Sequence, residues 1–290
     1  MSETERPLGE SGVRVPALGI GTNRWTSGEP GQARLNETLA AAVDVGMGFF
    51  DTAEVYGFGR SERALGVAAG QDGRPVVLAS KFAPLPARLT AAQFDSALDR
   101  TLERLGRGSL DLYYVHFPYS LRGMDTWMNA MAKAVEAKKI RAVGISNCNV
   151  AQMRKAADVL AHYGVPLAAN QVQYSLLHRA PETNGVLEAC SQMNVALVAY
   201  RPMAGGAVSA DPGKRKGPAG LADTLQEVAA AHDVATLQVA LAWLLKRNDH
   251  VIAIPGATKP DHVRQNSRAL SLELSDEEFA SIDRASTSAR

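Results

Sequence analysis

Short apolar runs alternate with amphipathic stretches along almost the whole chain. The runs are nearly continuous in apolar residues, which is typical of strands buried on both faces of a parallel sheet. We expect eight such strands, at residues 17–22, 49–53, 76–82, 110–117, 140–146, 167–174, 196–202 and 251–257. Helical patterns occupy residues 33–46, 61–70, 91–106, 123–138, 150–162, 183–193, 219–232, 236–247, 260–270 and 275–285.

The pattern at residues 91–106 illustrates how the sequence predicts where a helix begins and ends. One face carries the apolar residues Phe94, Ala97, Leu98, Leu102 and Leu105. Thr90 and Gln93 have the spacing of a capping box, and Gly106 is a typical end signal. Ser275 and Glu278 form a second box at the start of the last helical pattern.

Eight strands that are each followed by a helix favour an α/β fold, the (β/α)₈ TIM barrel. A doubly wound open sheet remains the alternative, because alternation alone does not show closure; the count of eight favours the barrel. Residues 6–14 have the pattern of an N-terminal β-hairpin that closes the barrel at the N-terminal ends of its strands. Extra helices are expected towards the C-terminus. No repeat or linker divides the chain, so we expect residues 1–290 to be one domain.

The composition excludes several classes of protein. The 290 residues are 46% hydrophobic and 21% charged with a net charge of +1, so neither nucleic acid nor an anionic membrane is an expected partner. There are only two cysteines, no apolar run of the ~20 residues that span a membrane, and no apolar segment of a signal peptide near the start. We therefore expect a cytoplasmic protein, a monomer or weak homo-oligomer.

In a barrel, chemistry takes place at the C-terminal ends of the strands. Polar residues at these predicted ends are Thr22, Asn23, Asp51, Lys81, His116, Ser146, Asn147, Asn170, Gln171, Tyr200 and Arg201. Taken singly, Asp51 could cap a helix, Lys81 could be a solvated charge and His116 could be a core residue. Because the barrel brings all strand ends to one mouth, a functional cluster is the better interpretation.

Three of these groups, Asp51, Lys81 and His116, make chemical sense together with Tyr56. Tyr56 follows Asp51 in "DTAEVYG", and its phenol is a weak acid at neutral pH. An ammonium at Lys81 would stabilise the phenolate, Asp51 would orient that ammonium, and the His116 imidazole would contact the same oxygen. The set therefore predicts a proton donor aimed at a developing alkoxide. Making an alcohol from a carbonyl also needs a hydride, which indicates a nicotinamide cofactor.

These residues lie in segments that resemble the aldo-keto reductases. "DTAEVYG", "ASKF", "YYVHFP", "VGISN", "NQVQYS", "LVAYRP" and "IPGATKPDHVRQN" have the order and spacing of that family, from about Leu18 to about Asn266. The resemblance implies a barrel that reduces aldehydes and ketones with NADP(H), without a Rossmann glycine motif. It also implies that Tyr56 is the general acid, that Lys81 and Asp51 tune it, and that His116 orients the carbonyl.

The resemblance further implies a set of cofactor-binding residues and a substrate pocket. Ser146, Asn147 and Gln171 would hold the nicotinamide carboxamide, and Tyr200 would stack beneath its ring. The full cofactor set is Gly21, Thr22, Asp51, Ser146, Asn147, Gln171, Tyr200, Arg201, Pro202, Ala204, Gly256, Thr258, Lys259, His262, Gln265 and Asn266. The pocket would be formed by Trp25, Tyr56, His116 and Phe117, although Trp25 could instead pack under a loop at the rim.

The sequence departs from the family pattern at three places. Arg201 stands where many relatives have serine, and it either reaches the pyrophosphate or pairs with a carboxylate. Gly256 and His262 replace the lysine and arginine typical of strong NADPH preference, so NAD(H) is a weaker alternative cofactor, with Lys259 and Arg264 as substitute charges. The short loop after His116 and the short C-terminal tail indicate a broad set of small carbonyl substrates.

Two other functions remain open at this point. A regulatory subunit could keep the barrel and bind cofactor without turnover, although the four site residues are all present. Lys81 could instead form a Schiff base, which would need a depressed pKa that a neighbouring Asp51 opposes. The six histidines are scattered without metal-ligand spacing, so we expect no metal.

Overall fold

A computed structural model describes residues 5–25, 31–206, 208, 218 and 220–287. Its centre is an eight-stranded parallel sheet in the order β10-β9-β8-β7-β6-β5-β4-β3. The strands are β3 (Ile20–Gly21), β4 (Phe49–Asp51), β5 (Val77–Phe82), β6 (Leu110–Val115), β7 (Ile140–Ser146), β8 (Leu167–Gln173), β9 (Ala196–Tyr200) and β10 (Val251–Ile254). All eight lie within the predicted segments.

The first and last strands meet and close the sheet. Leu18 and Gly21 form parallel bridges to Ala253 and Gly256, and the Gly19 amide donates to the Ala253 carbonyl at 2.9 Å. The sheet is therefore a barrel and not the open doubly wound alternative. β3 is shorter than predicted because the residues before it pair only by these isolated bridges.

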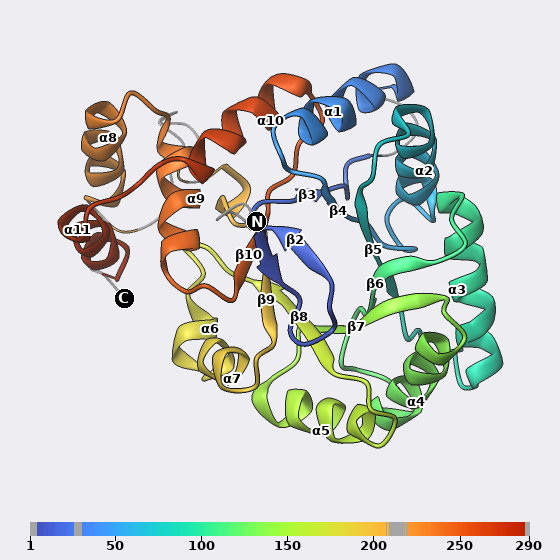
Figure 1. The fold of residues 1–290 in the computed structure, drawn as a ribbon. Helices are drawn as coiled ribbons and strands as arrows, with labels where there is room; N and C mark the ends of the chain where they lie inside the picture. Colours follow the sequence, from blue (N-terminus) through green and yellow to red (C-terminus); the bar gives the residue numbers. More distant parts are fainter. Residues whose placement is uncertain (1–4, 26–30, 207, 209–217, 219, 288–290) are drawn as a thin grey trace.

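The helices surround the barrel, as Figure 1 shows. They are α1 (Gln32–Asp44), α2 (Arg60–Asp72), α3 (Ala91–Leu105), α4 (Gly123–Glu136), α5 (Val150–Ala161), α6 (Ala180–Thr183), α7 (Val186–Gln192), α8 (Leu221–Ala231), α9 (Thr236–Lys246), α10 (Pro260–Ser267) and α11 (Asp276–Thr287). α8 and α11 pack side by side beyond α9, and they are the extra C-terminal helices expected from the sequence.

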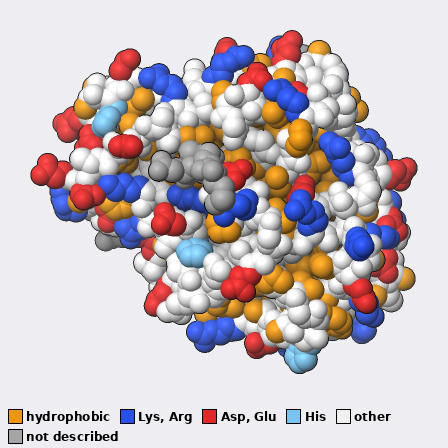
Figure 2. Space-filling model, viewed as in Figure 1, with side chains coloured by type: hydrophobic (Ala, Val, Ile, Leu, Met, Phe, Trp, Pro, Cys, Tyr) orange, Lys and Arg blue, Asp and Glu red, His pale blue; other side chains and the backbone are white. Residues whose placement is uncertain are grey.

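The predicted N-terminal hairpin is present and covers one end of the barrel. β1 (Glu5–Pro7) pairs antiparallel with β2 (Arg14–Pro16), and the pair crosses in front of the barrel centre in Figure 1. The Arg6 guanidinium donates to the carbonyls of Leu245 and Asn248 at 2.8 and 3.0 Å, just before β10 begins. The hairpin therefore closes the N-terminal ends of the strands. Figure 2 shows this face, where basic and acidic side chains are interspersed.

The core has an inner and an outer part. Inside the barrel, small alanine side chains from several strands pack with Leu8, Val13 and Val15 of the hairpin. Two large rings of this inner cluster lie tightly against glycines of neighbouring segments: a Cβ on Gly144 would lie 2.3 Å from Tyr114, and a Cβ on Gly19 would lie 2.6 Å from Phe49. Outside the barrel, a larger apolar cluster fills the layer between sheet and helices. This packed interior makes the strands a rigid support for the residues at their ends.

The predicted helix caps are also present. The Gln93 amide donates to Thr90 Oγ1 at 3.3 Å, and the Thr90 amide donates to Gln93 Oε1 at 3.1 Å. Gly106 ends this helix with a left-handed φ of 62°, a conformation that favours glycine. At the start of α11, the Ser275 amide donates to Glu278 Oε2 at 2.7 Å, which completes the second box.

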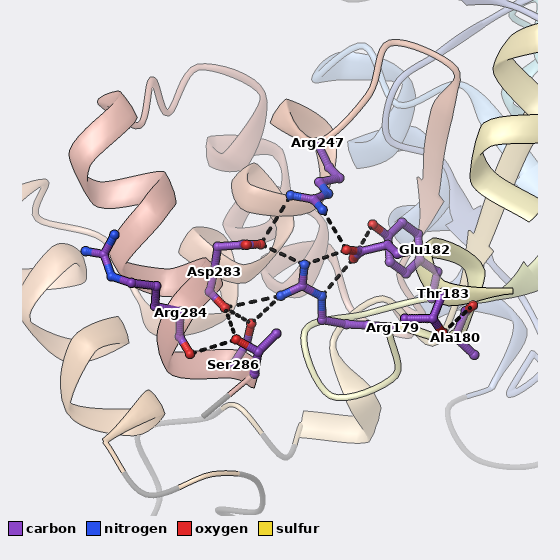
Figure 3. A network of polar contacts seen from close by, with 10 residues as sticks. Arg179, Ala180, Glu182, Thr183, Arg247, Asp283, Arg284 and Ser286 are labelled. Atoms are coloured by element: carbon purple, nitrogen blue, oxygen red, sulfur yellow. Dashed lines mark hydrogen bonds and ion pairs between the residues drawn. The ribbon is translucent and has the colours of Figure 1, made fainter. Parts of the chain in front are cut away.

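A network of charges ties α11 to the barrel (Figure 3). Arg179, in the loop after β8, contacts Glu182 and lies 2.8 Å from Asp283 Oδ1 on α11. Arg247, at the end of α9, contacts the same two carboxylates at 2.6 and 3.2 Å. The Arg179 guanidinium also lies 5.0 Å from the Trp243 ring centroid. Several partners for each charge make this network more stabilising than an isolated surface pair.

Among the described residues, no single helix is both long and apolar enough to span a membrane. In this described part of the chain, one pair of consecutive helices, α8 and α9, reaches that length and composition when taken together, and the two helices meet at 94°.

Candidate active site

The barrel brings a buried ion pair to the C-terminal end of the strands. Asp51 is the last residue of β4, Lys81 lies next to the end of β5, and both side chains are almost fully buried. The Lys81 ammonium donates to Asp51 Oδ1 and to the Thr52 carbonyl, the latter at 2.7 Å. Asp51 also accepts a hydrogen bond from Gln171 Nε2 at 2.7 Å, so both carboxylate oxygens have donors.

Each charge of this pair favours the ionised form of the other. Burial disfavours a charged Lys81, but the contacts with the Asp51 carboxylate and with Tyr56 outweigh it and raise the pKa of the ammonium. Burial raises the pKa of Asp51, and the hydrogen bonds from Lys81 and Gln171 act in the opposite direction. The solvated-charge interpretation of Lys81 is therefore wrong: the side chain is 0% exposed.

Tyr56 lies next to this pair, and His116 lies next to Tyr56. The Lys81 Nζ atom is 5.1 Å from the Tyr56 ring centroid, and the Tyr56 and His116 rings meet edge to face at 5.8 Å. Burial and the nearby Lys81 charge lower the pKa of His116 to about 3, so its imidazole is neutral at neutral pH. Phe117 stacks on His116 with centroids 4.1 Å apart. The structure thus brings the four expected residues together.

A second group of polar side chains continues from this cluster along the mouth. Ser146 Oγ donates to the Gln171 carbonyl at 2.8 Å, and Asn147 Nδ2 donates to Ser146 Oγ at 3.0 Å. The Tyr200 hydroxyl donates to Asn147 Oδ1 at 3.0 Å. Asn147 has a left-handed φ of 58°, which asparagine tolerates better than most residues. Four predicted cofactor residues therefore form one connected set beside His116.

Gly21 and Thr22 lie at the closure of the barrel. A Cβ on Gly21 would lie 3.0 Å from the Ile254 carbonyl, so the tight contact between β3 and β10 favours glycine there. Thr22 is buried, and its hydroxyl donates to the Asp51 carbonyl at 3.0 Å. Both residues lie at the mouth of the barrel, as the sequence predicts. That Gly21 and Thr22 approach the cofactor closely stays a prediction.

The residues after β9 and β10 form the rest of the expected cofactor set. Arg201 is exposed, Pro202 is buried, and Ala204 has a left-handed φ of 49°. Of the glycine-containing loop at 203–217, residues 207 and 209–217 lie outside the described part of the chain.

The segment that would meet the adenosine end of a dinucleotide runs from Gly256 into α10. Pro260 is at the first turn of the helix, and the Lys259 side chain makes no capping hydrogen bond. The remaining predicted contacts here are Gly256, Thr258, His262, Gln265 and Asn266. All lie on this segment, and all except the buried Asn266 are exposed or partly exposed residues. Within the described residues, Asn266 Nδ2 is a buried donor without a partner. The N-terminus of α10, which has no side-chain cap, fits an anionic group, and the Asn266 amide near the other end of the helix fits a hydrogen-bond acceptor on a ligand.

Charge on this segment is partly neutralised. Arg264 Nη1 lies 3.3 Å from Asp261 Oδ1, and both side chains are exposed. The Lys259 side chain is exposed and forms no ion pair with any residue that the structure describes, so its charge is less engaged than that of Arg264.

Trp25 is fully buried, and its indole N–H donates to the Ala257 carbonyl at 2.6 Å. It packs against Phe50 with centroids 6.0 Å apart. This side chain fastens the loop after β3 to the segment after β10. Its role as a pocket wall stays a prediction. The contacts with Ala257 and Phe50 fit the alternative, in which Trp25 packs under a loop at the rim.

Sequence reasoning did not assign Glu54, which the structure places at the same mouth. Glu54 accepts the Ala83 amide at 2.6 Å and forms an ion pair with Arg88, whose Nη2 lies 2.9 Å from Glu54 Oε2. It links the loop that carries Tyr56 to the loop after β5. The position of Glu54 inside "DTAEVYG" was the one sign in the sequence that it belongs to the site. Its partner Arg88 is 34 residues away, and no local pattern connects the two.

Among the residues that the structure describes, no group of three or more His, Cys, Asp or Glu side chains could hold a metal ion.

Comparisons with known proteins agree with the fold and the site. The model of the aldo/keto reductase family matches residues 17–287, which confirms the resemblance seen in the motifs. Aldo-keto reductase yakc [NADP(+)] of Schizosaccharomyces pombe is 32% identical over 95% of this chain and 89% of its own length. Methylglyoxal reductase YeaE of Escherichia coli is 34% identical over 94% and 92%.

A solved structure of similar sequence shows the same architecture. The aldo/keto reductase from Klebsiella pneumoniae, crystallised with NADP and acetate, superposes with a TM-score of 0.84. It is 31% identical, and the match covers 98% of this chain and 95% of that one.

Proposed function

Because this chain belongs to the aldo/keto reductase family, we propose that it reduces aldehydes and ketones to alcohols with NADPH, and that Tyr56 donates the proton. Membership of the family supports carbonyl reduction in general. The names of two relatives, an NADP(+) enzyme and a methylglyoxal reductase, support this cofactor and this class of substrate. The identity of the acid rests on the site itself.

The observation that carries the proposal is the buried Lys81–Asp51 pair beneath the Tyr56 ring. When Tyr56 gives up its proton, a phenolate forms, and the adjacent ammonium stabilises that negative charge. Asp51 and the Thr52 carbonyl hold the ammonium in place, and burial strengthens the electrostatic interaction by excluding water. The charge that develops on Tyr56 is thus met by a positive group already in position.

His116 has a different role in this proposal. With a pKa of about 3, its imidazole carries a single proton at neutral pH and does not act as a cationic acid. A neutral imidazole can still donate one N–H to the carbonyl oxygen and orient it towards Tyr56. Asn147 Nδ2 donates to the backbone carbonyl of His116 at 3.4 Å, which helps to fix this strand end.

The residues at the mouth fit a nicotinamide dinucleotide. Ser146, Asn147 and Gln171 would bind the carboxamide, Tyr200 would pack on the ring, and the segment from Gly256 to Asn266 would bind the adenosine phosphate end. When bound, the cofactor supplies the hydride for the carbonyl carbon. NADH is expected to serve more weakly, since Lys259 and Arg264 are the nearest substitutes for the charges that other relatives carry.

The structure weighs against the two alternatives. A Schiff-base lysine must be neutral to attack a carbonyl, whereas the pKa of Lys81 is raised by Asp51 and Tyr56 despite burial. A binding-only subunit would not need Tyr56, Lys81, Asp51 and His116 in mutual contact. We also propose that the protein accepts a broad set of carbonyl compounds; a cytoplasmic location and a monomer or weak homo-oligomer stay predictions.

The test of the proposed function is an assay that follows loss of NADPH absorbance. The panel should contain aliphatic and aromatic aldehydes, ketones and dicarbonyls, each measured with NADPH and with NADH. We expect turnover of several aldehydes with NADPH. Tight NADPH binding without turnover of any compound would favour the regulatory alternative.

A further inference from the structure

Two tyrosine rings face the Lys81 ammonium. Its Nζ atom is 5.1 Å from the ring centroid of Tyr56 and 5.7 Å from the ring centroid of Tyr114. Asp51 and the Thr52 carbonyl accept two hydrogen bonds from the same ammonium. The proposed proton transfer uses the contacts of Lys81 with these two residues and with Tyr56. It gives no role to Tyr114.

The register of the barrel strands places the Tyr114 ring beside this lysine. Lys81 on β5 is paired directly with Tyr114 on β6, and Tyr114 is paired in turn with Gly144 on β7. Tyr114 belongs to the inner cluster of the barrel. Gly144 leaves the space that its ring fills, since a Cβ there would lie 2.3 Å from Tyr114 Cδ1. The neighbouring strands therefore fix the position of the ring.

The hydroxyl group of Tyr114 does not account for its presence here. The side chain is 0% exposed, and its oxygen has no hydrogen-bond partner among the described residues. Burial and the nearby charge of Asp51 raise the pKa of this phenol well above its ordinary value, so it keeps its proton at neutral pH. What Tyr114 offers its surroundings is thus the face of a neutral ring.

That face is suited to hold a cation. The face of an aromatic ring carries partial negative charge and attracts a cation within about 6 Å of the ring centroid. The attraction is strongest where water is excluded, and the side chains of Lys81 and Tyr114 are both fully buried. Because the ring has no formal charge, it can hold the ammonium without neutralising it. A second carboxylate would instead cancel the positive charge that a Tyr56 phenolate needs.

We propose that Tyr114 is a positioning residue for the reaction, and that its ring face holds the Lys81 ammonium where it stabilises the Tyr56 phenolate. This inference rests on the proposed function and adds a residue to its proton transfer. Without the ring face, the chemical step should slow by about three- to thirtyfold. NADPH affinity should stay the same, because Tyr114 is outside the expected cofactor set.

The test compares rings of nearly equal shape at position 114 by single-turnover reduction of one aldehyde with NADPH. Tyr114→Phe is the conservative variant: it keeps the ring face, removes the unpartnered hydroxyl and should react at nearly the wild-type rate. Tyr114→trifluorophenylalanine has a similar shape, but its fluorine atoms withdraw the negative charge from the ring face. It should react about three- to thirtyfold more slowly than Tyr114→Phe, with equal NADPH affinity.

Tyr113 provides the matched control on the same strand. Its side chain is also 0% exposed and its hydroxyl also has no described partner, but its ring lies in the outer layer, 6.0 Å from the Phe94 ring centroid. Tyr113→trifluorophenylalanine should react as fast as Tyr113→Phe. Adding Lys81→Met tests the contact itself. Fluorination at position 114 should lower the urea midpoint of unfolding when Lys81 is present, and leave it unchanged in the Lys81→Met background.

The other outcomes contradict the inference in different ways. Equal rates of the two ring variants at position 114 would overturn it and leave the proposed function standing. A Tyr114→Phe variant that is as slow as the fluorinated one would show that the hydroxyl acts, and an equal loss on fluorination of Tyr113 would show a general effect on β6. Either result overturns the role of the ring face. Absence of aldehyde reduction by the wild-type protein would overturn the proposed function and this inference with it.

Discussion

Gln171 Nε2 donates a hydrogen bond to Asp51 Oδ2 at 2.7 Å, and so connects β8 to β4 across the barrel mouth. The amide is almost fully buried, and its nitrogen is committed to the carboxylate that holds Lys81. Its oxygen can still accept a hydrogen bond from a ligand. One side chain can therefore contact the proposed carboxamide site and the ion pair that supports Tyr56.

Replacing Gln171 by methionine should weaken both the fold and the cofactor site. Asp51 Oδ2 would lose its neutral donor while remaining buried, which costs about 1–3 kcal/mol of unfolding free energy. NADPH affinity, measured by quenching of protein fluorescence, should fall as well. Gln173→Met, on the same strand but half-buried, is the control for stability. Equal unfolding free energies of the two variants would show that the hydrogen bond from Gln171 to Asp51 does not contribute to stability.

Lys81→Met should remove activity and also destabilise the protein. The lost ammonium can no longer stabilise a phenolate, and Asp51 becomes a buried charge without its ion-pair partner, at a cost of about 3 kcal/mol. Adding Asp51→Asn removes that unpaired charge. The double variant should therefore recover most of the stability in urea unfolding without recovering turnover. Recovery of turnover along with stability would mean that Lys81 acts only through folding.

The neutral state of buried His116 should appear in the pH dependence of stability. Its pKa is lowered to about 3 from the ordinary 6.5, so the unfolded chain binds a proton that the folded chain excludes. Stability is full above pH 6.5 and is lost as the pH falls towards 3. From pH 7 to 5, wild type should lose about 2 kcal/mol more unfolding free energy than His116→Asn. Parallel pH curves would show that folding does not lower the pKa of His116.

Much of the barrel follows from local patterns in the sequence. The buried strands, the amphipathic helix at residues 91–105 and its Thr90–Gln93 capping box depend on neighbouring residues, so they could be predicted. Lys81 and His116 could be placed at the mouth because the barrel topology brings the strand ends together. The motif as a whole then identified the family.

Contacts between distant segments were not predictable in the same way. The Glu54–Arg88 pair, the Trp25 bond to Ala257 and the charge network around Arg179 each join residues that no periodicity connects. Gly21 illustrates the difference. The sequence predicts a close approach of the cofactor at this glycine, and the structure adds a tight contact between β3 and β10, where a Cβ would lie 3.0 Å from the Ile254 carbonyl.

The preference for NADPH over NADH should depend on Asp261 and His262. Asp261 lies 3.3 Å from Arg264 and competes with an anionic ligand for that guanidinium. Asp261→Asn should raise NADPH affinity severalfold and leave NADH nearly unchanged. His262→Arg should enlarge the preference further, because one charge-assisted hydrogen bond contributes about 1.5–3 kcal/mol. The ratio of kcat/KM for the two cofactors measures this; a ratio that neither variant changes would place the 2′-phosphate elsewhere.

The central claim is that Tyr56 donates the proton, and single-turnover reduction of one aldehyde by Tyr56→Phe tests it most directly. The measurement is the rate of NADPH absorbance loss in stopped flow with enzyme in excess, so that product release does not limit it. The variant should reduce the aldehyde about 10²–10⁴-fold more slowly than wild type, since it lacks only the acidic hydroxyl. Its NADPH affinity should stay within a fewfold of wild type. A variant that binds NADPH normally and keeps a tenth or more of the wild-type rate would contradict the claim.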